Sequence, residues 1–328
     1  MLTGETAGFR SSHRSSSLFG GIRKGASMAK GSILALMLCL AMLPGFAQGQ
    51  ESKDTGGEKP LLIGLIPEQN IFKQIERYTP LAEYLAKKVG MKIRLKVLTR
   101  YGNMIDNFVS SGIDGAFFGS FTYTLAHLKL GVEVLARPEA LDGSSTYHGL
   151  IIVRKDSGIR HVRNMKGKRM AFVDKATTAG FLFPLAYLRR HGVTDYRTYF
   201  REVYFAGTHE AATHDVLDKK ADIGAPKNTI FERLAQADTR IRRELVVLEK
   251  SADVPENALA VRRDLDTSLK KALLNALLGM SEDREGRTIL LNFGAKRFIL
   301  TTDKEYSPIM QYAQEVNLDL AKYDYMNE

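Results

Sequence analysis

The chain has 328 residues, of which 44% are hydrophobic, and this length predicts one large domain or two of medium size. Its formal net charge is +10, but five basic residues and one acidic residue precede residue 48, so the rest of the chain carries a surplus of only +6. Because this modest surplus is spread along the sequence, it argues against a nucleic-acid partner and suits a small anionic ligand.

The segment 28–47 has the features of a secretory signal peptide. Lys30 precedes an apolar run at 33–43, and a Pro-Gly pair and small residues follow that run. We expect cleavage near Ala47 or Gly49 and therefore export of the mature protein. Residues 1–27 are expected to form a coil extension, with Met28 as an alternative start, and residues 48–59 are expected to form a polar linker.

Two alternatives to a cleavable signal are open. A membrane anchor needs roughly 20 apolar residues to cross a bilayer, and the run at 33–43 is shorter. A lipoprotein signal would end at Cys39, but a small residue is expected just before such a cysteine and Leu38 stands there. Cys39 is the only cysteine, so a chain cleaved after it would have neither a disulfide nor a cysteine nucleophile.

Strands and helices alternate in the first part of the chain beyond the linker. Residues 61–67 form an apolar run typical of a buried strand, and the next helix is predicted to have Thr79 as its cap and Pro80 as its first residue. Further strands are expected at 92–99, 114–120 and 133–137, and further helices at 103–109 and 121–130. This alternation predicts a parallel or mixed sheet with helices on both faces.

A second α/β unit begins with a long strand at 147–159. Further strands are expected at 169–174, 202–206, 221–225 and 244–251, and helices at 178–191, 209–220 and 228–236. The chain is predicted to close with a strand at 258–265 and helices at 266–280, 282–293 and 303–316.

The order of these elements predicts an α/β fold with two lobes. Because the last strand and the C-terminal helices need a partner sheet, we assign residues 60–147 and 251–328 to lobe 1 and residues 148–250 to lobe 2. The chain then crosses between the lobes near Tyr147 and near Lys250. Paired crossovers form a two-stranded hinge, and the cleft between hinged lobes can close on a ligand.

Two strand-to-helix junctions carry small or hydroxyl-bearing residues. Residues 177–180, Thr-Thr-Ala-Gly, stand where unpaired backbone N–H groups and the helix dipole favour an anion. An ordinary helix cap is the alternative. Gly119, Ser120 and Thr122 stand at a similar junction in the first unit. Two such junctions facing one cleft would suit a tetrahedral oxyanion.

Three further side chains could complete such a site. His209 stands at the next strand-to-helix turn, where a neutral imidazole can donate one hydrogen bond and an anion would raise its pKa. A capping or surface histidine is the alternative. Tyr101 at a strand end and Tyr147 at the proposed crossover could each offer a hydroxyl to a ligand, or could simply pack in the core.

Signatures of an enzyme are weak. His209 and His214 are five positions apart, whereas a zinc protease needs a spacing of four. Neither a G-x-S-x-G elbow nor a Walker or Rossmann glycine signature occurs. Glu210 is the one obvious carboxylate beside His209, and it suits the first turn of a helix. We therefore expect no enzymatic activity, no metal and no cofactor.

Five segments in order resemble the phosphate, phosphite and phosphonate substrate-binding proteins of ABC transporters. They are "YTPLAEYL", "GIDGAFFGSFTY", "YHGLIIVRKDSGI", "MKGKRMAFVDKATTAGFLFP" and "YFAGTHEAATHDVLDKKADIGA". The resemblance covers roughly Leu61 to Leu265. It implies the type II periplasmic binding protein fold, in agreement with the two-lobed prediction, and a location in the periplasm.

The resemblance also implies ligand-binding residues. The family holds phosphonate oxygens with tyrosines, a Ser-Thr-Ser run at a helix N-terminus and a histidine. By position these fall on Tyr101, Tyr147, Thr177, Thr178 and His209. The third serine of the run is replaced by Ala179, which lacks the hydroxyl and keeps the backbone N–H.

Members of this family that bind aminoalkylphosphonates pair the ligand's amine with carboxylates. The corresponding positions here are Thr229 or its neighbours and Asn257, which are uncharged. Lys227 and Glu256 lie nearby in the sequence, and Lys227 is expected to be a solvated lysine at a helix start. An amine without a carboxylate would lose about 1.5–3 kcal/mol per hydrogen bond. The sequence therefore favours phosphite, phosphate or a simple alkylphosphonate over 2-aminoethylphosphonate.

The combined interpretation is a monomeric periplasmic binding protein. It would capture a small phosphorus oxyanion by cleft closure and deliver it to an ABC transporter permease and its ATPase. One alternative is a sensing protein that presents its ligand-bound form to a membrane sensor kinase. The other is an enzyme on the same scaffold, which would need an acid or base such as Glu210 near His209.

Overall fold

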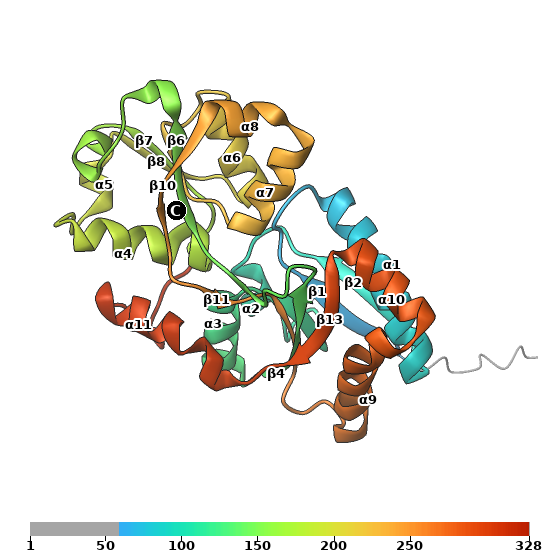
Figure 1. Cartoon of the computed structure of the whole chain (residues 1–328). Coiled ribbons are helices and arrows are strands. Elements are labelled where there is room, and N and C mark those ends of the chain that lie inside the picture. Colours follow the sequence, from blue (N-terminus) through green and yellow to red (C-terminus); the bar gives the residue numbers. More distant parts are fainter. Residues whose placement is uncertain (1–58, 328) are drawn as a thin grey trace, which may run out of the picture. The chain divides into compact units, whose positions relative to one another are not determined.

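The computed structural model describes residues 59–327 (Figure 1). The predicted extension, the signal peptide and all but the last residue of the predicted linker lie outside the described residues. Two mixed sheets and a short two-stranded ribbon organise the described part of the chain. Within residues 59–327, no helix is both long enough and apolar enough to cross a membrane.

The larger sheet has six strands in the order β13-β4-β12-β3-β1-β2. Its strands are β1 (Leu61–Leu65), β2 (Ile93–Val97), β3 (Gly115–Phe118), β4 (Glu133–Ala140), β12 (Ala258–Val261) and β13 (Ala295–Leu300). β1 pairs in parallel with β2 and β3, whereas β12 runs antiparallel to β3 and β4. Because β12 and β13 come late in the chain, this sheet joins its beginning to its end.

Helices cover both faces of the six-stranded sheet. α1 (Ile71–Val89), α9 (Thr267–Leu278) and α10 (Arg284–Phe293) pack on one face, together with the 3₁₀ turn η4 (Gly279–Glu282). Alternate residues of β1, namely Leu61, Ile63 and Leu65, are buried against them. α2 (Asn103–Asp106), α3 (Ser120–Leu130), the 3₁₀ turn η5 (Asp303–Tyr306) and α11 (Ser307–Glu315) belong to the core on the other face. Successive side chains of a strand point to opposite faces of the sheet, which is why every second residue of β1 packs against the first group of helices.

The second sheet has five strands in the order β10-β6-β9-β7-β8. They are β6 (Leu150–Arg154), β7 (Arg169–Phe172), β8 (Glu202–Phe205), β9 (Ile223–Gly224) and β10 (Leu245–Lys250). One core contains residues of α6 (His209–Leu217), α7 (Asn228–Ala237) and α8 (Thr239–Glu244). α4 (Phe183–Arg190), the 3₁₀ turn η2 (Val162–Met165) and α5 (Tyr196–Tyr199) pack into the core that also holds α3 and α11.

The chain passes between the sheets through a short antiparallel ribbon. β5 (Thr146–Tyr147) leads into the second sheet, and β11 (Val254–Pro255) leads back to the first. These positions are close to the crossovers predicted at Tyr147 and Lys250. Two strands that leave and return side by side form a hinge on which the two lobes can move.

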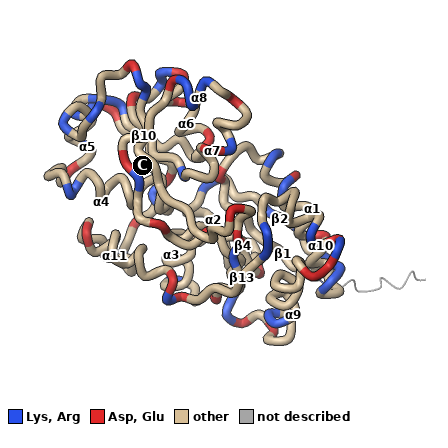
Figure 2. Tube along the Cα trace, in the orientation of Figure 1, with Lys and Arg blue, Asp and Glu red and all other residues tan. Residues whose placement is uncertain are grey.

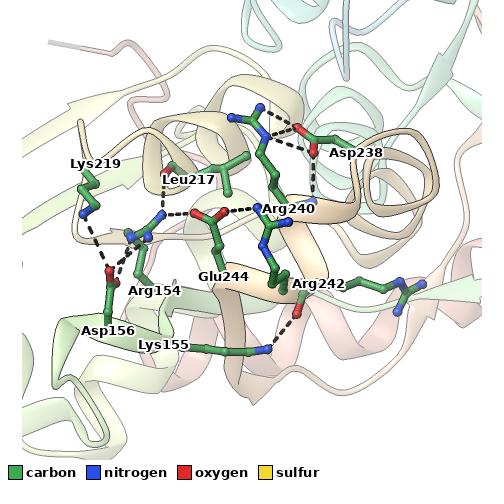
Figure 3. Close-up of polar contacts among 10 residues, drawn as sticks. Arg154, Lys155, Asp156, Leu217, Lys219, Asp238, Arg240, Arg242 and Glu244 are labelled. Atoms are coloured by element: carbon green, nitrogen blue, oxygen red, sulfur yellow. Dashed lines mark hydrogen bonds and ion pairs between the residues drawn. The ribbon is translucent and has the colours of Figure 1, made fainter.

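A network of polar contacts surrounds Arg154, the last residue of β6 (Figure 3). Arg154 donates to the Leu217 carbonyl at 2.7 Å and to Glu244 Oε2 at 3.0 Å. Arg154 Nε also donates to Asp156 Oδ1 at 2.9 Å, in the 3₁₀ turn η1 (Lys155–Ser157). The network therefore fastens the ends of α6 and α8 to the sheet. Figure 2 shows that acidic and basic residues are interspersed along the outer helices of both lobes.

The helix α1 begins earlier than predicted. Its cap is Asn70, whose Oδ1 accepts the N–H of Phe72 at 3.0 Å. Pro80 lies inside the helix, and the Thr79 hydroxyl donates to the Ile75 carbonyl instead of capping. Buried residues at positions 74, 78, 81 and 85 follow the helical spacing on both sides of the proline. Packing of this apolar face therefore outweighs the one intrahelical hydrogen bond that Pro80 removes.

Candidate ligand-binding site

A small cavity lies where segments of both lobes meet. Its walls are loops and helix starts that follow or precede strands of the two sheets, together with the hinge strand β5. The lining residues are Ile66, Glu68, Tyr101, Gly119, Thr122, Tyr147, Thr177, Thr178, His209, Lys227 and Asn257. Because parallel strands end at the same edge of a sheet, residues far apart in the sequence converge there.

The segment 177–180 begins a helical run that extends to Arg190. Thr178–Leu182 is a π-helical turn, and α4 follows it directly. The first backbone N–H groups of such a run have no partner within it and lie at the positive end of the helix dipole. Gly180 permits this turn to approach β7, since a Cβ there would lie 2.4 Å from the Cβ of Val173. The close approach places Thr177 and Thr178 in the cavity wall.

The threonine hydroxyls take part in hydrogen bonds around the cavity. Thr177 Oγ1 donates to a backbone carbonyl of its own turn at 2.6 Å. Thr178 Oγ1 accepts the N–H of Phe121 at 3.0 Å, and Thr122 Oγ1 donates to the Ala176 carbonyl at 2.8 Å. Phe121 and Thr122 belong to α3, on the six-stranded sheet, so these hydrogen bonds hold the lobes together at the cavity.

Two buried tyrosines, Tyr101 and Tyr147, line the cavity. The Tyr101 hydroxyl is buried and has no hydrogen-bond partner among the described residues. Tyr147 is buried and lines the same cavity as Thr178. Burial raises the pKa of both tyrosines, so each keeps its proton and can act as a donor. A buried hydroxyl without a partner is costly, and a ligand oxygen would satisfy that of Tyr101.

His209 is held as a neutral imidazole. Its Nδ1 accepts the backbone N–H of Lys227 at 3.2 Å, which assigns the ring hydrogen to Nε2. Burial lowers the pKa of His209 to about 3, although the charge of Glu68 opposes the shift. The backbone N–H of His209 donates to the Glu68 carbonyl at 3.1 Å, which fixes the start of α6 against lobe 1. His209 therefore carries one N–H donor, on Nε2, that Lys227 does not use.

Lys227 brings a charged group into the cavity wall. Its side chain is 3% exposed, and its Nζ donates to Glu68 Oε1 and Asn257 Oδ1, each at 3.0 Å. Nζ also donates to Glu256 Oε1 and lies 4.3 Å from the centroid of the Tyr147 ring. We call the three oxygen-bearing residues and the Tyr147 ring the ammonium cage.

The charges in the cage hold each other ionised. Burial alone would raise the pKa of Glu68, but the nearby positive charge of Lys227 lowers it to about 2. Burial alone would lower the pKa of Lys227, but Glu256 and Glu68 raise it above its usual value. Both groups are therefore charged at neutral pH, and their attraction is strong because little water screens it.

A wider groove of about 650 Å³ adjoins the small cavity and shares Glu68, Lys227 and Asn257 with it. Thr229 lines this groove, at the start of α7. Arg233, one helical turn further along α7, donates to Gln69 Oε1 at 3.0 Å and so connects the two lobes at the edge of the groove. Within residues 59–327, no group of His, Cys, Asp and Glu side chains is arranged to hold a metal ion.

Comparison with known proteins assigns the family. A family described as "ABC transporter, phosphonate, periplasmic substrate-binding protein" matches residues 63–306. The chain belongs to this family. This phosphonate-family binding protein is 26% identical over 293 residues to the phosphonates-binding periplasmic protein of Escherichia coli K12, a match that covers 88% of this chain and 83% of that protein.

Two further relatives carry related names. The phosphate-import protein PhnD of Mycolicibacterium smegmatis is 25% identical over 209 residues, which cover 60% of this chain and 64% of that protein. The structure of PhnD1 from Prochlorococcus marinus MIT 9301 in complex with methylphosphonate superposes with a TM-score of 0.71. That match has 22% identity and covers 79% of this chain and 98% of PhnD1. The likeness confirms the predicted two-lobed α/β fold of type II periplasmic binding proteins.

The structure brings most of the predicted site residues of this binding protein together. Those that line the small cavity are Tyr101, Tyr147, Thr177, Thr178, His209 and Asn257. Ser120 lies behind the wall, where its hydroxyl donates to the Pro255 carbonyl of the hinge at 2.6 Å. Ala179 packs against Gly149, and Thr229 lies in the wider groove. The contacts of these residues with a ligand remain predictions.

Sequence reasoning missed part of the charged cluster. The expectation that Lys227 is solvated is wrong, because its side chain is buried and paired. Glu68 was not considered, although it follows β1 by three residues and so lies at the edge where the other strands end. A carboxylate three residues after a fully apolar strand was the signal available in the sequence. Its lysine partner is 159 positions away, and that pairing has no sequence signal.

Proposed function

We propose that this protein captures a small phosphorus oxyanion, such as phosphite, phosphate or a simple alkylphosphonate, and delivers it to a membrane permease and its ATPase. We further infer that residues 28–47 direct its export to the periplasm. The observation that carries the proposal is the buried hydroxyl of Tyr101 beside the cavity, which has no hydrogen-bond partner within residues 59–327. His209 and the first N–H groups of the helical run at Thr178 offer further donors at the same place.

The chemistry of these donors suits an oxyanion. A cleft that closes around an anion strips its water, so each lost hydrogen bond must be replaced by a protein donor. Backbone N–H groups at a helix start, a tyrosine hydroxyl and a neutral imidazole N–H provide such donors without a counter-charge. The names of the relatives, which mention phosphonates, phosphate import and a methylphosphonate complex, support phosphorus oxyanions as the ligand class.

Glu68 adds a means of discrimination between anions. Its carboxylate is ionised and lines the same cavity, so it can accept a hydrogen bond from a protonated ligand oxygen. Phosphite, phosphate and alkylphosphonates lose their second proton near neutral pH, so a form with a proton on oxygen is available to bind, whereas sulfate has no such form. Sulfate, which has no proton to donate, would therefore bring its negative charge beside the Glu68 carboxylate in a desolvated cleft.

Isothermal titration calorimetry of the chain from Gln48 onward tests the proposal. We expect tight binding of phosphite, phosphate or methylphosphonate and much weaker binding of sulfate, which serves as the matched tetrahedral control. Absence of heat with all three phosphorus oxyanions would contradict the proposal. Equal affinity for sulfate would leave an oxyanion site but would remove the role given to Glu68.

A pair of histidine variants tests the location of the site. His209→Ala should weaken binding by roughly 10- to 150-fold, because a hydrogen bond to a charged ligand is lost. His214→Ala on the same helix is the control, since His214 does not line the cavity. Identical affinities in the two folded variants would place the ligand elsewhere.

A further inference from the structure

The ammonium group of Lys227 is surrounded by hydrogen-bond acceptors in the way that the amine of a bound ligand would be. Lys227 is carried by lobe 2, at the start of α7. The groups around its Nζ come from the other side of the cleft and from the hinge: Glu68 follows β1, Glu256 and Asn257 stand between β11 and β12, and Tyr147 lies on β5. The cage is thus built by one lobe and the hinge, and the second lobe inserts a cation into it.

The composition of the cage is that of a primary-amine site. Two carboxylates and an amide oxygen accept the three N–H donors of one ammonium group. The face of the Tyr147 ring closes the site at 4.3 Å from Nζ, a cation–π distance. An ammonium group that replaced that of Lys227 would find every one of these partners in place.

The cage adjoins the donors for the oxyanion. Glu68, Tyr147, Lys227 and Asn257 line the same small cavity as Thr178. Tyr147 belongs to both parts, because its ring centroid lies 4.3 Å from Lys227 Nζ and the residue lines the cavity together with Thr178. The amine of a short aminoalkylphosphonate whose phosphoryl group sat against Thr178 would therefore arrive where Lys227 Nζ lies.

We propose that Lys227 is a specificity-determining residue that excludes phosphonates bearing a terminal amine by filling the amine site with the protein's own ammonium group. The inference rests on the proposed capture of a phosphorus oxyanion at this cavity. A ligand amine would have to displace Lys227 from Glu68 and Glu256 or sit beside it as a second cation, and either change loses charge-assisted hydrogen bonds. Removal of the lysine side chain leaves an amine site with its carboxylates intact.

The wild-type protein gives the first test. Ethylphosphonate and 2-aminoethylphosphonate differ by one amine, and calorimetry should show that ethylphosphonate binds roughly 10- to 150-fold more tightly. Equal affinities, or a preference for the amine, would overturn the proposal. This measurement does not depend on the folding of any variant.

Two substitutions at position 227 give the second test. Lys227→Ala opens the cage, and this variant should bind 2-aminoethylphosphonate more tightly than the wild type by a similar factor and should reverse the preference over ethylphosphonate. Lys227→Met removes the charge and keeps most of the volume, so it should not gain the amine ligand. If both variants, or neither of them, bound 2-aminoethylphosphonate more tightly than the wild type, the proposal that Lys227 fills the amine site would be wrong.

Ethylammonium, which has no phosphoryl group, separates this inference from the proposed function. Millimolar ethylammonium should raise the Tm of Lys227→Ala and leave that of Lys227→Met unchanged. If the wild type binds no phosphorus oxyanion and ethylammonium still stabilises Lys227→Ala selectively, the cage is supported and the proposed function fails. If the wild type binds ethylphosphonate and ethylammonium has no selective effect, the cage is overturned and the proposed function stands.

Discussion

Lowering the pH from 7.5 to 5.0 should destabilise the folded protein through His209. The side chain is buried, its Nδ1 accepts the Lys227 N–H at 3.2 Å, and burial lowers its pKa from 6.5 to about 3. The folded-state pKa therefore lies below the unfolded-state value, and below pH 6.5 the unfolded chain takes up a proton that the folded chain does not. This contribution to stability is fully present above pH 6.5 and is lost as the pH falls toward 3.

The expected size follows from the two pKa values. Each pH unit below 6.5 costs about 1.4 kcal/mol until the folded-state pKa is reached, so the loss from His209 at pH 5.0 is about 2 kcal/mol. Urea unfolding at pH 7.5 and 5.0 measures it, with His209→Asn as the reference variant. The Asn Oδ1 can accept the same Lys227 N–H but does not titrate.

The comparison isolates one group, because every other titrating residue is common to both proteins. Between the two pH values, the wild type should lose about 2 kcal/mol more of its unfolding free energy than His209→Asn. A difference below about 0.5 kcal/mol, within the usual error of such comparisons, would show that His209 titrates normally in the folded state. The neutral, Nε2-protonated imidazole assigned to the site would then be wrong.

Three other substitutions test the cavity and its wall. Tyr101→Phe should weaken oxyanion binding by roughly 10- to 150-fold in calorimetry, because the ligand loses a hydrogen bond, while the unfolding free energy of the ligand-free protein should not fall, because the hydroxyl has no partner there among the described residues. Gly180→Ala should destabilise the protein by about 1–3 kcal/mol in urea unfolding, because the added Cβ overlaps the side chain of Val173, which directly follows β7. Thr178→Val should cost the closed form about 1–3 kcal/mol, because the N–H of Phe121 loses its acceptor, and X-ray scattering should show a larger radius of gyration.

Each of these tests has a defined opposite result. An unchanged Kd for Tyr101→Phe would remove that hydroxyl from the binding site. Gly279→Ala is the control for Gly180, since a Cβ at Gly279 would meet open space, and equal stability of the two variants would contradict the close approach to β7. A Thr178→Val protein with the wild-type radius of gyration and Kd would show that the hydrogen bond to Phe121 does not hold the lobes closed.

Several of the strands that sequence reasoning found have a continuous apolar pattern. β3 and β12 are buried at every residue, and β6 at all but its last. β13 was missed because only Ala295 and Phe298 of its six residues are buried. Their spacing of three does not follow the two-residue alternation of a half-buried strand, so the sequence pattern is weak.

The oxyanion part of the cavity was predictable for a related reason. Tyr101, Thr178 and His209 each lie in a loop or helix start that follows a strand. Thr178 and His209 follow the neighbouring strands β7 and β8, whose shared edge brings them together, and Tyr101 follows β2 of the other sheet. The chemistry of each residue is local to its own loop or helix start. The alternation of strands and helices predicts that Thr178 and His209 share one edge, whereas their meeting with Tyr101 depends on how the two lobes pack.

By itself, the sequence determined the two-lobed α/β order and the hydroxyl-bearing helix start at residues 177–180, because both depend on short-range patterns. Only the tertiary structure decided that Lys227 is buried between Glu68 and Glu256 and that Asn70, not Thr79, caps α1. A lysine is buried or solvated according to the charges that the fold brings beside it, and Glu68 lies 159 positions away. Because Lys227 and Glu68 come from different lobes, the sequence of either segment alone could not predict the ligand specificity of the site.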